Sequence, residues 1–148
     1  MKRLCFILCA TFCLLFTAEG QIENILGDWV TVDDKTGQSY SVVNIYKGNN
    51  GKYYGKISKM LIAGTDNLLC TECEGKYHNV PILGLVFIQD MEYKDGCLQG
   101  GRLLDPESGK FYYGKISYSA KSGKLELRGS LDRLGWLGRS QFWKRYNK

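Results

Sequence analysis

Short runs rich in Val, Ile, Tyr and Phe alternate with clusters of Gly, Asn and Asp along most of the chain. Few segments place apolar residues at the three- and four-residue spacing of an amphipathic helix. Apolar runs bounded by turn residues are typical of antiparallel strands joined as hairpins. The pattern predicts eight strands, at residues 29–33, 40–47, 52–61, 83–89, 97–104, 110–119, 124–131 and 139–145.

Turn signals separate most of these runs. They lie at residues 33–37, 48–51, 94–96, 105–109 and 120–123, and each contains Gly, Asn or Asp where a tight turn needs a positive φ. One longer connection, residues 62–82, joins the third and fourth runs. Short turns between neighbouring strands favour an antiparallel meander, and eight strands is a natural number for closure into a barrel.

The sequence Tyr-Tyr-Gly-Lys-Ile-Ser occurs twice, in residues 53–58 and 112–117. Strand alternation puts Tyr, Gly and Ile of each copy on one face and exposes Lys56 and Lys115 on the other. A glycine inside a strand marks a sharp bend or a close approach of two backbones. The repeat therefore favours a closed barrel over an open sheet.

The first twenty residues have the three parts of a secretory signal peptide: Lys2 and Arg3, an apolar run over 4–16, and Thr-Ala-Glu-Gly before the expected cleavage near Gly20. The run is shorter than the ~20 residues of a membrane helix, and the residues before Cys13 do not favour a lipoprotein. We expect a periplasmic or secreted domain over residues 21–148, without a membrane span.

Charge and motifs exclude several classes of function. The domain over 21–148 carries a net charge of +4 that is spread evenly, whereas nucleic-acid binding needs a clustered basic face. His78 is the single histidine, and the acidic pairs 33–34 and 105/107 lie in predicted turns. A phosphate-binding glycine loop is absent from the sequence. We expect a protein without catalytic activity, cofactor or metal.

Three cysteines remain in the expected domain: Cys70, Cys73 and Cys97. In an oxidising compartment, Cys70 and Cys73 most simply form a disulfide that staples the long connection, which leaves Cys97 free. Alternatively, Cys97 pairs with one of them. A zinc site with His78 and a redox-active pair are further alternatives, although the spacing fits no common metal motif and no helical pattern follows Cys73.

Aromatic and basic residues are the best candidates for binding. Gly27-Asp28-Trp29 opens the first strand and places an indole to plug the barrel floor, and the last strand carries Arg139, Trp143 and Arg145. We expect these two strands to pair, with a guanidinium over an indole. The tyrosines could line a cavity or fill the core: Tyr40, Tyr46, Tyr53 and Tyr112.

Several stretches, taken in this order, resemble domain of unknown function 2147, a family of exported bacterial proteins. They are residues 27–29, 36–37, 41–46, 51–57, 100–106, 109–112, 125–129 and 138–143. The resemblance implies a lipocalin-like barrel in the bacterial envelope, without an established reaction or ligand. Some similar members carry the pair matched by Cys70 and Cys73, but a later cysteine that the family leads us to expect is replaced by Tyr113-Gly114.

The leading hypothesis is an exported, non-enzymatic barrel that binds a small apolar or amphipathic ligand. An alternative is a protein-interaction or inhibitor module acting through residues 62–82. Alternation puts Arg128 on the outer face, yet its place in the family-like Leu-Arg-Gly stretch makes it a candidate. The candidate ligand-binding residues are Trp29, Tyr40, Tyr46, Tyr53, Tyr112, Arg128, Arg139 and Trp143.

Overall fold

The structure is a computed structural model that describes residues 19–33 and 35–147. The predicted signal peptide, residues 1–20, therefore lies outside the described residues apart from its last two positions. Asp34, one of the predicted acidic pair, is outside them as well.

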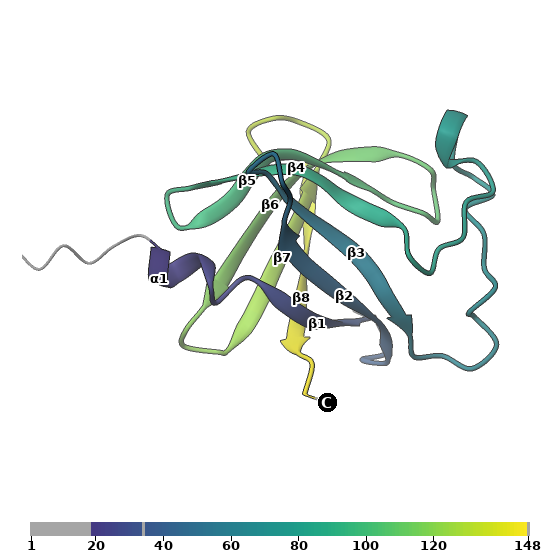
Figure 1. Ribbon diagram of the computed structural model, residues 1–148, viewed down its shortest axis with the longest axis horizontal. Helices are drawn as coiled ribbons and strands as arrows, with labels where there is room; N and C mark the ends of the chain where they lie inside the picture. Colours follow the sequence, from purple (N-terminus) through teal and green to yellow (C-terminus); the bar gives the residue numbers. More distant parts are fainter. Residues whose placement is uncertain (1–18, 34, 148) are drawn as a thin grey trace, which may run out of the picture.

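The described residues form a closed antiparallel barrel of eight strands in sequence order, as predicted (Figure 1). A short helix precedes the barrel and a 3-10 turn lies in the long connection between the third and fourth strands. The elements are α1 (Glu19–Ile22), β1 (Gly27–Val32), β2 (Ser39–Lys47), β3 (Tyr53–Met60), η1 (Gly75–Tyr77), β4 (Val86–Lys94), β5 (Cys97–Leu104), β6 (Phe111–Ser119), β7 (Lys124–Ser130) and β8 (Gly138–Arg145).

The first and last strands close the barrel, as the sequence predicted. Trp29 pairs with Arg145 and Val30 pairs with Lys144. The Arg145 guanidinium lies 3.8 Å from the centre of the Trp29 ring, which confirms the expected cation–π contact. This short ladder is extended by the backbone of Tyr146, whose N–H donates to the carbonyl of Asp28 (3.0 Å).

The fourth strand differs from its prediction: β4 covers Val86–Lys94 rather than 83–89. Gly84 has a φ of 90° and belongs to the long connection. The prediction ended the strand before Asp90, which takes a φ of 56° within β4. Opposite this bend, Gly101 of β5 has no room for a side chain, because a Cβ there would lie 2.6 Å from Met91 Sδ. The missing side chain lets β5 follow β4 closely.

The glycines of the repeated motif also mark close approaches. A Cβ on Gly55 would lie 2.8 Å from Ile88 Cγ1, and one on Gly114 would lie 2.9 Å from Leu103 Cγ. Lys56 and Lys115 are exposed, as alternation predicted. The repeat therefore performs the same structural task twice, which is to let a neighbouring side chain cross over the strand.

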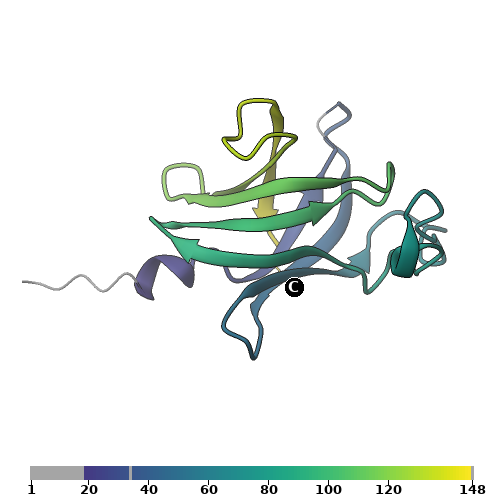
Figure 2. The same cartoon turned by 90° about the horizontal axis from the view of Figure 1, so that it is seen from above.

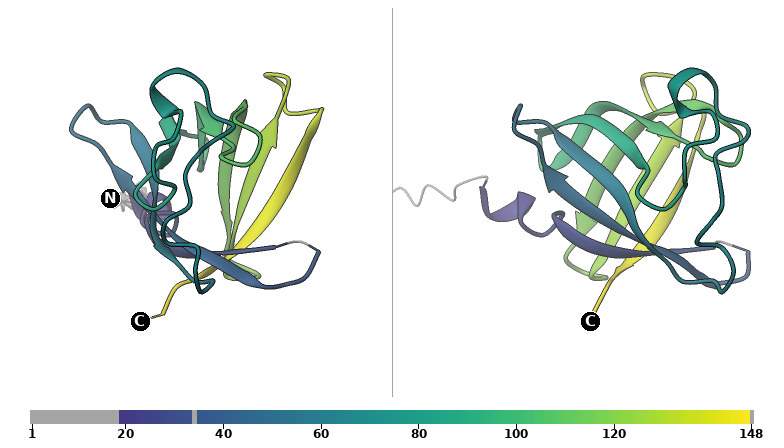
Figure 3. Two further views of the ribbon diagram at one scale, coloured as in Figure 1. Left: turned by 90° about the vertical axis from the view of Figure 1, so that its right-hand side faces the viewer. Right: turned by 45° about the vertical axis from the view of Figure 1, so that its right-hand side comes forward.

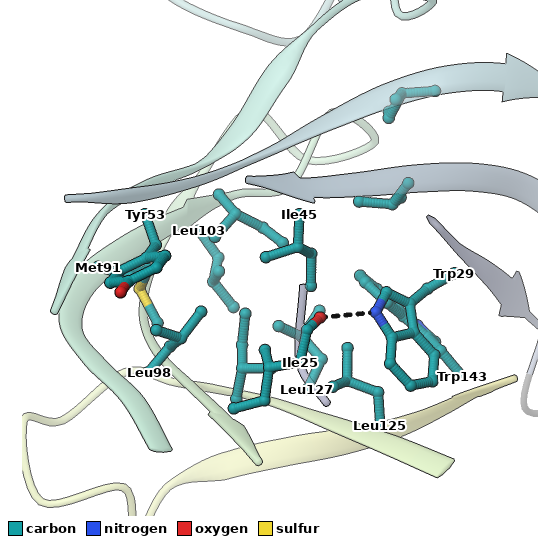
Figure 4. Close-up of a cluster of buried hydrophobic side chains, with 14 of the residues drawn as sticks. Ile25, Trp29, Ile45, Tyr53, Met91, Leu98, Leu103, Leu125, Leu127 and Trp143 are labelled. Carbon is teal, nitrogen blue, oxygen red and sulfur yellow. Dashed lines mark hydrogen bonds between the residues drawn. The ribbon is translucent and has the colours of Figure 1, made fainter. Parts of the chain in front are cut away.

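Large buried side chains form one cluster inside the barrel (Figure 4), and at the end covered by α1 this cluster includes Ile22 and Ile25. Trp29 is fully buried and its Nε1 donates to the carbonyl of Ile25 at 2.8 Å. Arg145 ties the same segment down, since Nη1 donates to the Leu26 carbonyl and Nη2 to the Asn24 carbonyl, both at 2.6 Å. Burial lowers the pKa of the Arg145 guanidinium. We call this end, with α1 and residues 23–26, the closed end.

The long connection, residues 61–85, lies at the opposite end from α1 (Figure 2). Cys70 and Cys73 form the predicted disulfide, and both are buried against Leu85 and Leu104. Cys97 is a free thiol at the start of β5, beside the β4–β5 turn and therefore toward the closed end. The alternatives that pair Cys97 with Cys70 or Cys73, or join all three around zinc, are wrong for this geometry.

Among residues 19–33 and 35–147, the structure contains no helix long and apolar enough to cross a membrane.

Candidate ligand-binding site

A cavity of about 1170 Å³ enters the barrel from the end opposite α1. We call this the open end. It is bordered by four connections: the β1–β2 turn (33–38), the long connection (61–85), the β5–β6 turn (105–110) and the β7–β8 loop (131–137). Figure 3 views the barrel from this side, with the long connection and the β7–β8 loop at different parts of the rim. A volume of this size accommodates an ordinary small-molecule ligand.

The inner wall of the cavity is apolar. Its lining includes buried side chains of the core cluster from several strands, with the partly buried Phe87 packed against them. The buried members are Val43, Ile57, Leu103, Leu127 and Trp143. Phe87 packs against Trp143 with ring centres 6.3 Å apart. Trp143 is 1% exposed, so its indole forms the floor between the cavity and the packed closed end.

Gly129 accounts for part of this space. It follows Leu125 and Leu127 on the inward face of β7, yet contributes no side chain to the cavity. A Cβ at this position would lie 3.6 Å from both Leu103 Cδ1 and Tyr112 Cβ, which is ordinary contact distance. Unlike Gly55 and Gly114, Gly129 therefore leaves room that a larger side chain would fill.

Polar groups lie toward the rim. Arg139 is exposed and lines the cavity, and Gln141 follows it inward on β8, where its Oε1 accepts from Trp143 Nε1 (3.3 Å). On the neighbouring strands β1 and β2, Thr31 and Ser41 share a hydrogen bond between their hydroxyls (2.9 Å). The rim thus offers a cation, an amide, hydroxyls and carboxylates around an apolar interior.

Hydrogen bonds within the β1–β2 turn, and contacts between the long connection and the β5–β6 turn, hold the rim in place. The Asp33 carboxylate accepts from the Thr36 backbone N–H (2.7 Å) and hydroxyl (2.9 Å), and these hydrogen bonds lower its pKa. Cys70 Sγ contacts the carbonyl of Pro106 at 3.4 Å, which joins the stapled connection to the β5–β6 turn. A Cβ on Gly109 would collide with the backbone of Glu72, so these two segments are in close contact.

The structure brings four of the candidate residues to the cavity: Tyr40, Tyr112, Arg139 and Trp143. It places Trp29 and Tyr53 in the packed core instead. Tyr46 lies on the outer face of β2, where its ring meets that of Tyr54 at 6.0 Å between centres. Arg128 also faces outward and binds the β7–β8 loop. Strand alternation explains both exclusions, since Ile45 and Leu127 point inward.

Sequence reasoning missed several lining residues. Gln141 and Gly129 could have been found from the inward alternation of their strands. Phe87 could not, because it directly precedes the buried Ile88 and the β3–β4 ladder has a register shift at this point. Trp136 and Leu137 lie in the β7–β8 loop, where the apolar stretch Leu-Gly-Trp-Leu between two strands was a signal in the sequence. Leu68 and Leu69 reach the rim from the long connection, whose path no local pattern specifies.

Comparison with known proteins supports this architecture. The chain is similar to protein HP1028 from the human pathogen Helicobacter pylori, which is described as belonging to the lipocalin family. The two share 26% identity with a TM-score of 0.70, and the match covers 83% of each chain. The barrel is accordingly lipocalin-like. No curated protein sequence matches the chain significantly.

Residues 27–145 match the family described as "Uncharacterized protein conserved in bacteria (DUF2147)". The match begins at the first residue of β1 and ends at the last residue of β8, so it spans the whole barrel. The family expected from the sequence is therefore confirmed, and the chain belongs to the DUF2147 family.

Proposed function

We propose that the protein is an exported, non-enzymatic barrel that binds a small apolar or amphipathic molecule in the cavity of the open end. The observation that carries the proposal is the cavity of about 1170 Å³, which is continuous with the rim and floored by Trp143. A barrel of this size is either filled by side chains or holds one small ligand. Here one end is filled and the other is not.

The distribution of polarity supports an amphipathic ligand. Buried side chains such as Val43, Ile57 and Leu127 surround the inner part of the cavity, where they would bind an apolar chain or ring. The rim carries Arg139 and Tyr40, which would hydrogen-bond a polar or anionic head group. A ligand with an apolar body and a polar end would satisfy both regions.

Export is part of the proposal. A disulfide persists in an oxidising compartment such as the periplasm or the extracellular space, and Cys70 and Cys73 form one. The signal-like segment at residues 1–20 agrees with this location.

Binding without catalysis is favoured by the position of the single histidine. His78 Nδ1 lies 3.1 Å from the Cys73 carbonyl on the stapled connection, and His78 does not line the cavity. Together with the lipocalin description of the H. pylori protein, this supports a carrier or sensor of small molecules.

A cavity-filling substitution tests the proposal. Gly129→Leu should fill the space beside Leu103 and Tyr112, whereas Lys124→Leu adds the same side chain to the exposed outer face of the same strand. Calorimetric titration with tetradecanoic acid, its methyl ester and a lysophosphatidylcholine should give a Kd below about 0.1 mM for at least one of them. Gly129→Leu should weaken that affinity about tenfold or more, since the ligand would lose its space.

Lys124→Leu should leave the affinity unchanged. The proposal fails if none of the three amphiphiles binds, or if Gly129→Leu binds as tightly as the parent protein while remaining folded.

One observation favours the alternative of a protein-interaction module acting through residues 62–82. Leu68 and Leu69 are 41% and 44% exposed on a connection stapled by a disulfide. A partner protein that binds there should be released by the double substitution Leu68→Ser, Leu69→Ser in a pull-down from the host envelope. If Gly129→Leu released it equally, the partner would bind elsewhere.

A further inference from the structure

The β7–β8 loop, residues 131–137, exposes large apolar side chains at the open end. Leu134 is 82% exposed, Trp136 is 80% exposed and Leu137 is 68% exposed. Contiguous apolar side chains of this size are unusual on a protein surface and mark sites of interaction. The other two tryptophans of the chain, Trp29 and Trp143, are buried.

Hydrogen bonds fix this loop in one shape. The Asp132 carboxylate accepts from the backbone N–H groups of Trp136 (3.0 Å) and Leu137 (2.6 Å). The N–H of Leu131 donates to the Leu137 carbonyl at 2.9 Å and closes the loop. The exposure of Trp136 and Leu137 is therefore set by the fold and does not come from a loose segment.

Arg128 braces the same loop from the outer face of β7. Its Nε and Nη2 both donate to the Gly135 carbonyl, at 2.9 and 2.6 Å. Its Nη1 lies 3.4 Å from the Ser140 hydroxyl on β8, and Ser140 in turn donates to Glu126 at 2.6 Å. The guanidinium thus connects the loop tip to two strands and is a positioning residue.

The charge around the apolar tip is positive. Residues 128–139 contain three arginines and one aspartate, for a net charge of +2. The Asp132 carboxylate is directed at backbone N–H groups of the loop, and these hydrogen bonds lower its pKa. The Arg133 guanidinium lies 5.9 Å from the centre of the Tyr113 ring, beside the loop.

From these observations we infer that the β7–β8 loop docks the protein on an anionic lipid surface. Tryptophan and leucine side chains partition into the interface of a bilayer, and neighbouring arginines interact with the phosphates and the negative surface potential. A fixed loop also loses little conformational entropy when it inserts. This combination fits a lipid surface better than a protein partner, because a single short loop is small beside the roughly 20–30 residues that each side of a standard protein interface contributes, whereas an interfacial anchor needs only a few apolar side chains.

Docking in this way would place one side of the cavity mouth, the side formed by the β7–β8 loop, against the lipid. The carboxylates at the mouth belong to the other three connections: Asp33, Glu72, Asp105 and Glu107. Trp136 and Leu137 border the cavity as well as the outer surface, and Arg139 follows them on the rim. An amphipathic molecule could then pass between the bilayer and the cavity without crossing water. This last step rests on the proposed function, whereas the docking itself does not.

Vesicle flotation tests the docking. The parent protein should float with phosphatidylcholine vesicles that contain about 30% phosphatidylglycerol, with an affinity about tenfold higher than for pure phosphatidylcholine. Leu134→Ser should reduce this affinity about tenfold, because it removes an apolar side chain from the inserted tip. Phe142→Ser is the matched control, since Phe142 is 52% exposed on β8 but outside the loop and the cavity. It should float like the parent.

The inference is overturned if the parent protein does not float, or if Leu134→Ser floats as well as the parent. It is also overturned if sedimentation shows self-association that Leu134→Ser abolishes, which would assign the tip to a second copy of the chain. Leu134 does not line the cavity, so titration of this variant with tetradecanoic acid in solution separates the two proposals. Unchanged titration with lost flotation supports docking, and lost titration with normal flotation contradicts it.

Discussion

The two ends of the barrel are built from the same eight strands of the described chain, yet they differ in how their interior is filled. At the closed end, Trp29 fills the interior and is held by Ile25 and Arg145. At the open end, Gly129 supplies no side chain, and the strands surround a cavity. The same strand pairing thus supports a packed core at one end and a cavity at the other.

The two ends also differ in where their polar bonds go. Arg145 at the closed end donates to two backbone carbonyls of the segment that covers the barrel. Around the open end, Asp33 and Asp132 instead bond within their own loops. The closed end is therefore joined across the chain. At the open end the β1–β2 turn and the β7–β8 loop are each fixed by their own bonds, and the long connection contacts the β5–β6 turn.

The largest difference in stability between the two ends should appear when one tryptophan at each end is replaced by alanine. Trp29→Ala leaves a large space in a fully buried position and should destabilise the protein by about 3–5 kcal/mol. Trp136→Ala removes an exposed side chain and should change the free energy of unfolding by less than about 0.5 kcal/mol. Urea denaturation followed by circular dichroism measures both. Equal losses would contradict the division of the barrel into two ends.

Two arginines on β8 provide the next comparison. Arg145→Met removes donors from the carbonyls of Leu26 and Asn24 and a cation from above Trp29, and should cost about 2–3 kcal/mol. Arg139→Met, at the exposed rim, should cost at most about 1 kcal/mol, because solvent weakens the interactions of an exposed guanidinium. Thermal or chemical unfolding of both variants checks this. A larger cost for Arg139→Met would place essential structure at the mouth.

Removing the disulfide should have a smaller and local effect. The loop closed by Cys70 and Cys73 is short, so the double change to Ser should cost at most about 2 kcal/mol in chain entropy. Hydrogen exchange should quicken in residues 61–85 and stay unchanged in β7 and β8. If protection fell throughout the barrel, the staple would be part of the main core and not of the rim.

The smallest effect concerns pH and the β7–β8 loop. Hydrogen bonds from Leu137 and Trp136 hold the pKa of Asp132 below its ordinary value, so its contribution is present above the unfolded-state pKa of about 3.9. That contribution is lost as pH falls through the lower folded-state pKa. Trp136 fluorescence should be constant between pH 5 and 8 and change in acid below about pH 4. An Asp132→Asn variant should lack the acid transition if the assignment is right.

Local patterns were enough to predict most of the barrel. Alternating runs and glycine turns located the strands. The pairing of the first strand with the last followed from the indole of Trp29 on one and the cations Arg139 and Arg145 on the other. The fourth strand was predicted to end at Gln89, whereas β4 runs to Lys94 and contains Asp90. Its positive φ is tolerated within β4 because Gly101 opposite has no side chain, a cross-strand relation that a local pattern does not contain.

The candidate site could be predicted only in part. Tyr112 and Trp143 were found because they are large and lie on strands, but Tyr46 was included although alternation with Ile45 puts it outside. The empty volume itself depends on which inward positions are small, as at Gly129, and on where the long connection runs. These are properties of the assembled barrel, so they emerge only when all strands are placed.

Native mass spectrometry of the protein purified from its own host is the most direct test of a barrel that is packed at one end and binds a ligand at the other. The account predicts that the parent protein retains a small-molecule mass and that Gly129→Leu, purified in the same way, carries none. A parent protein that is bare in every preparation, or a Gly129→Leu variant that retains the same mass, would contradict it.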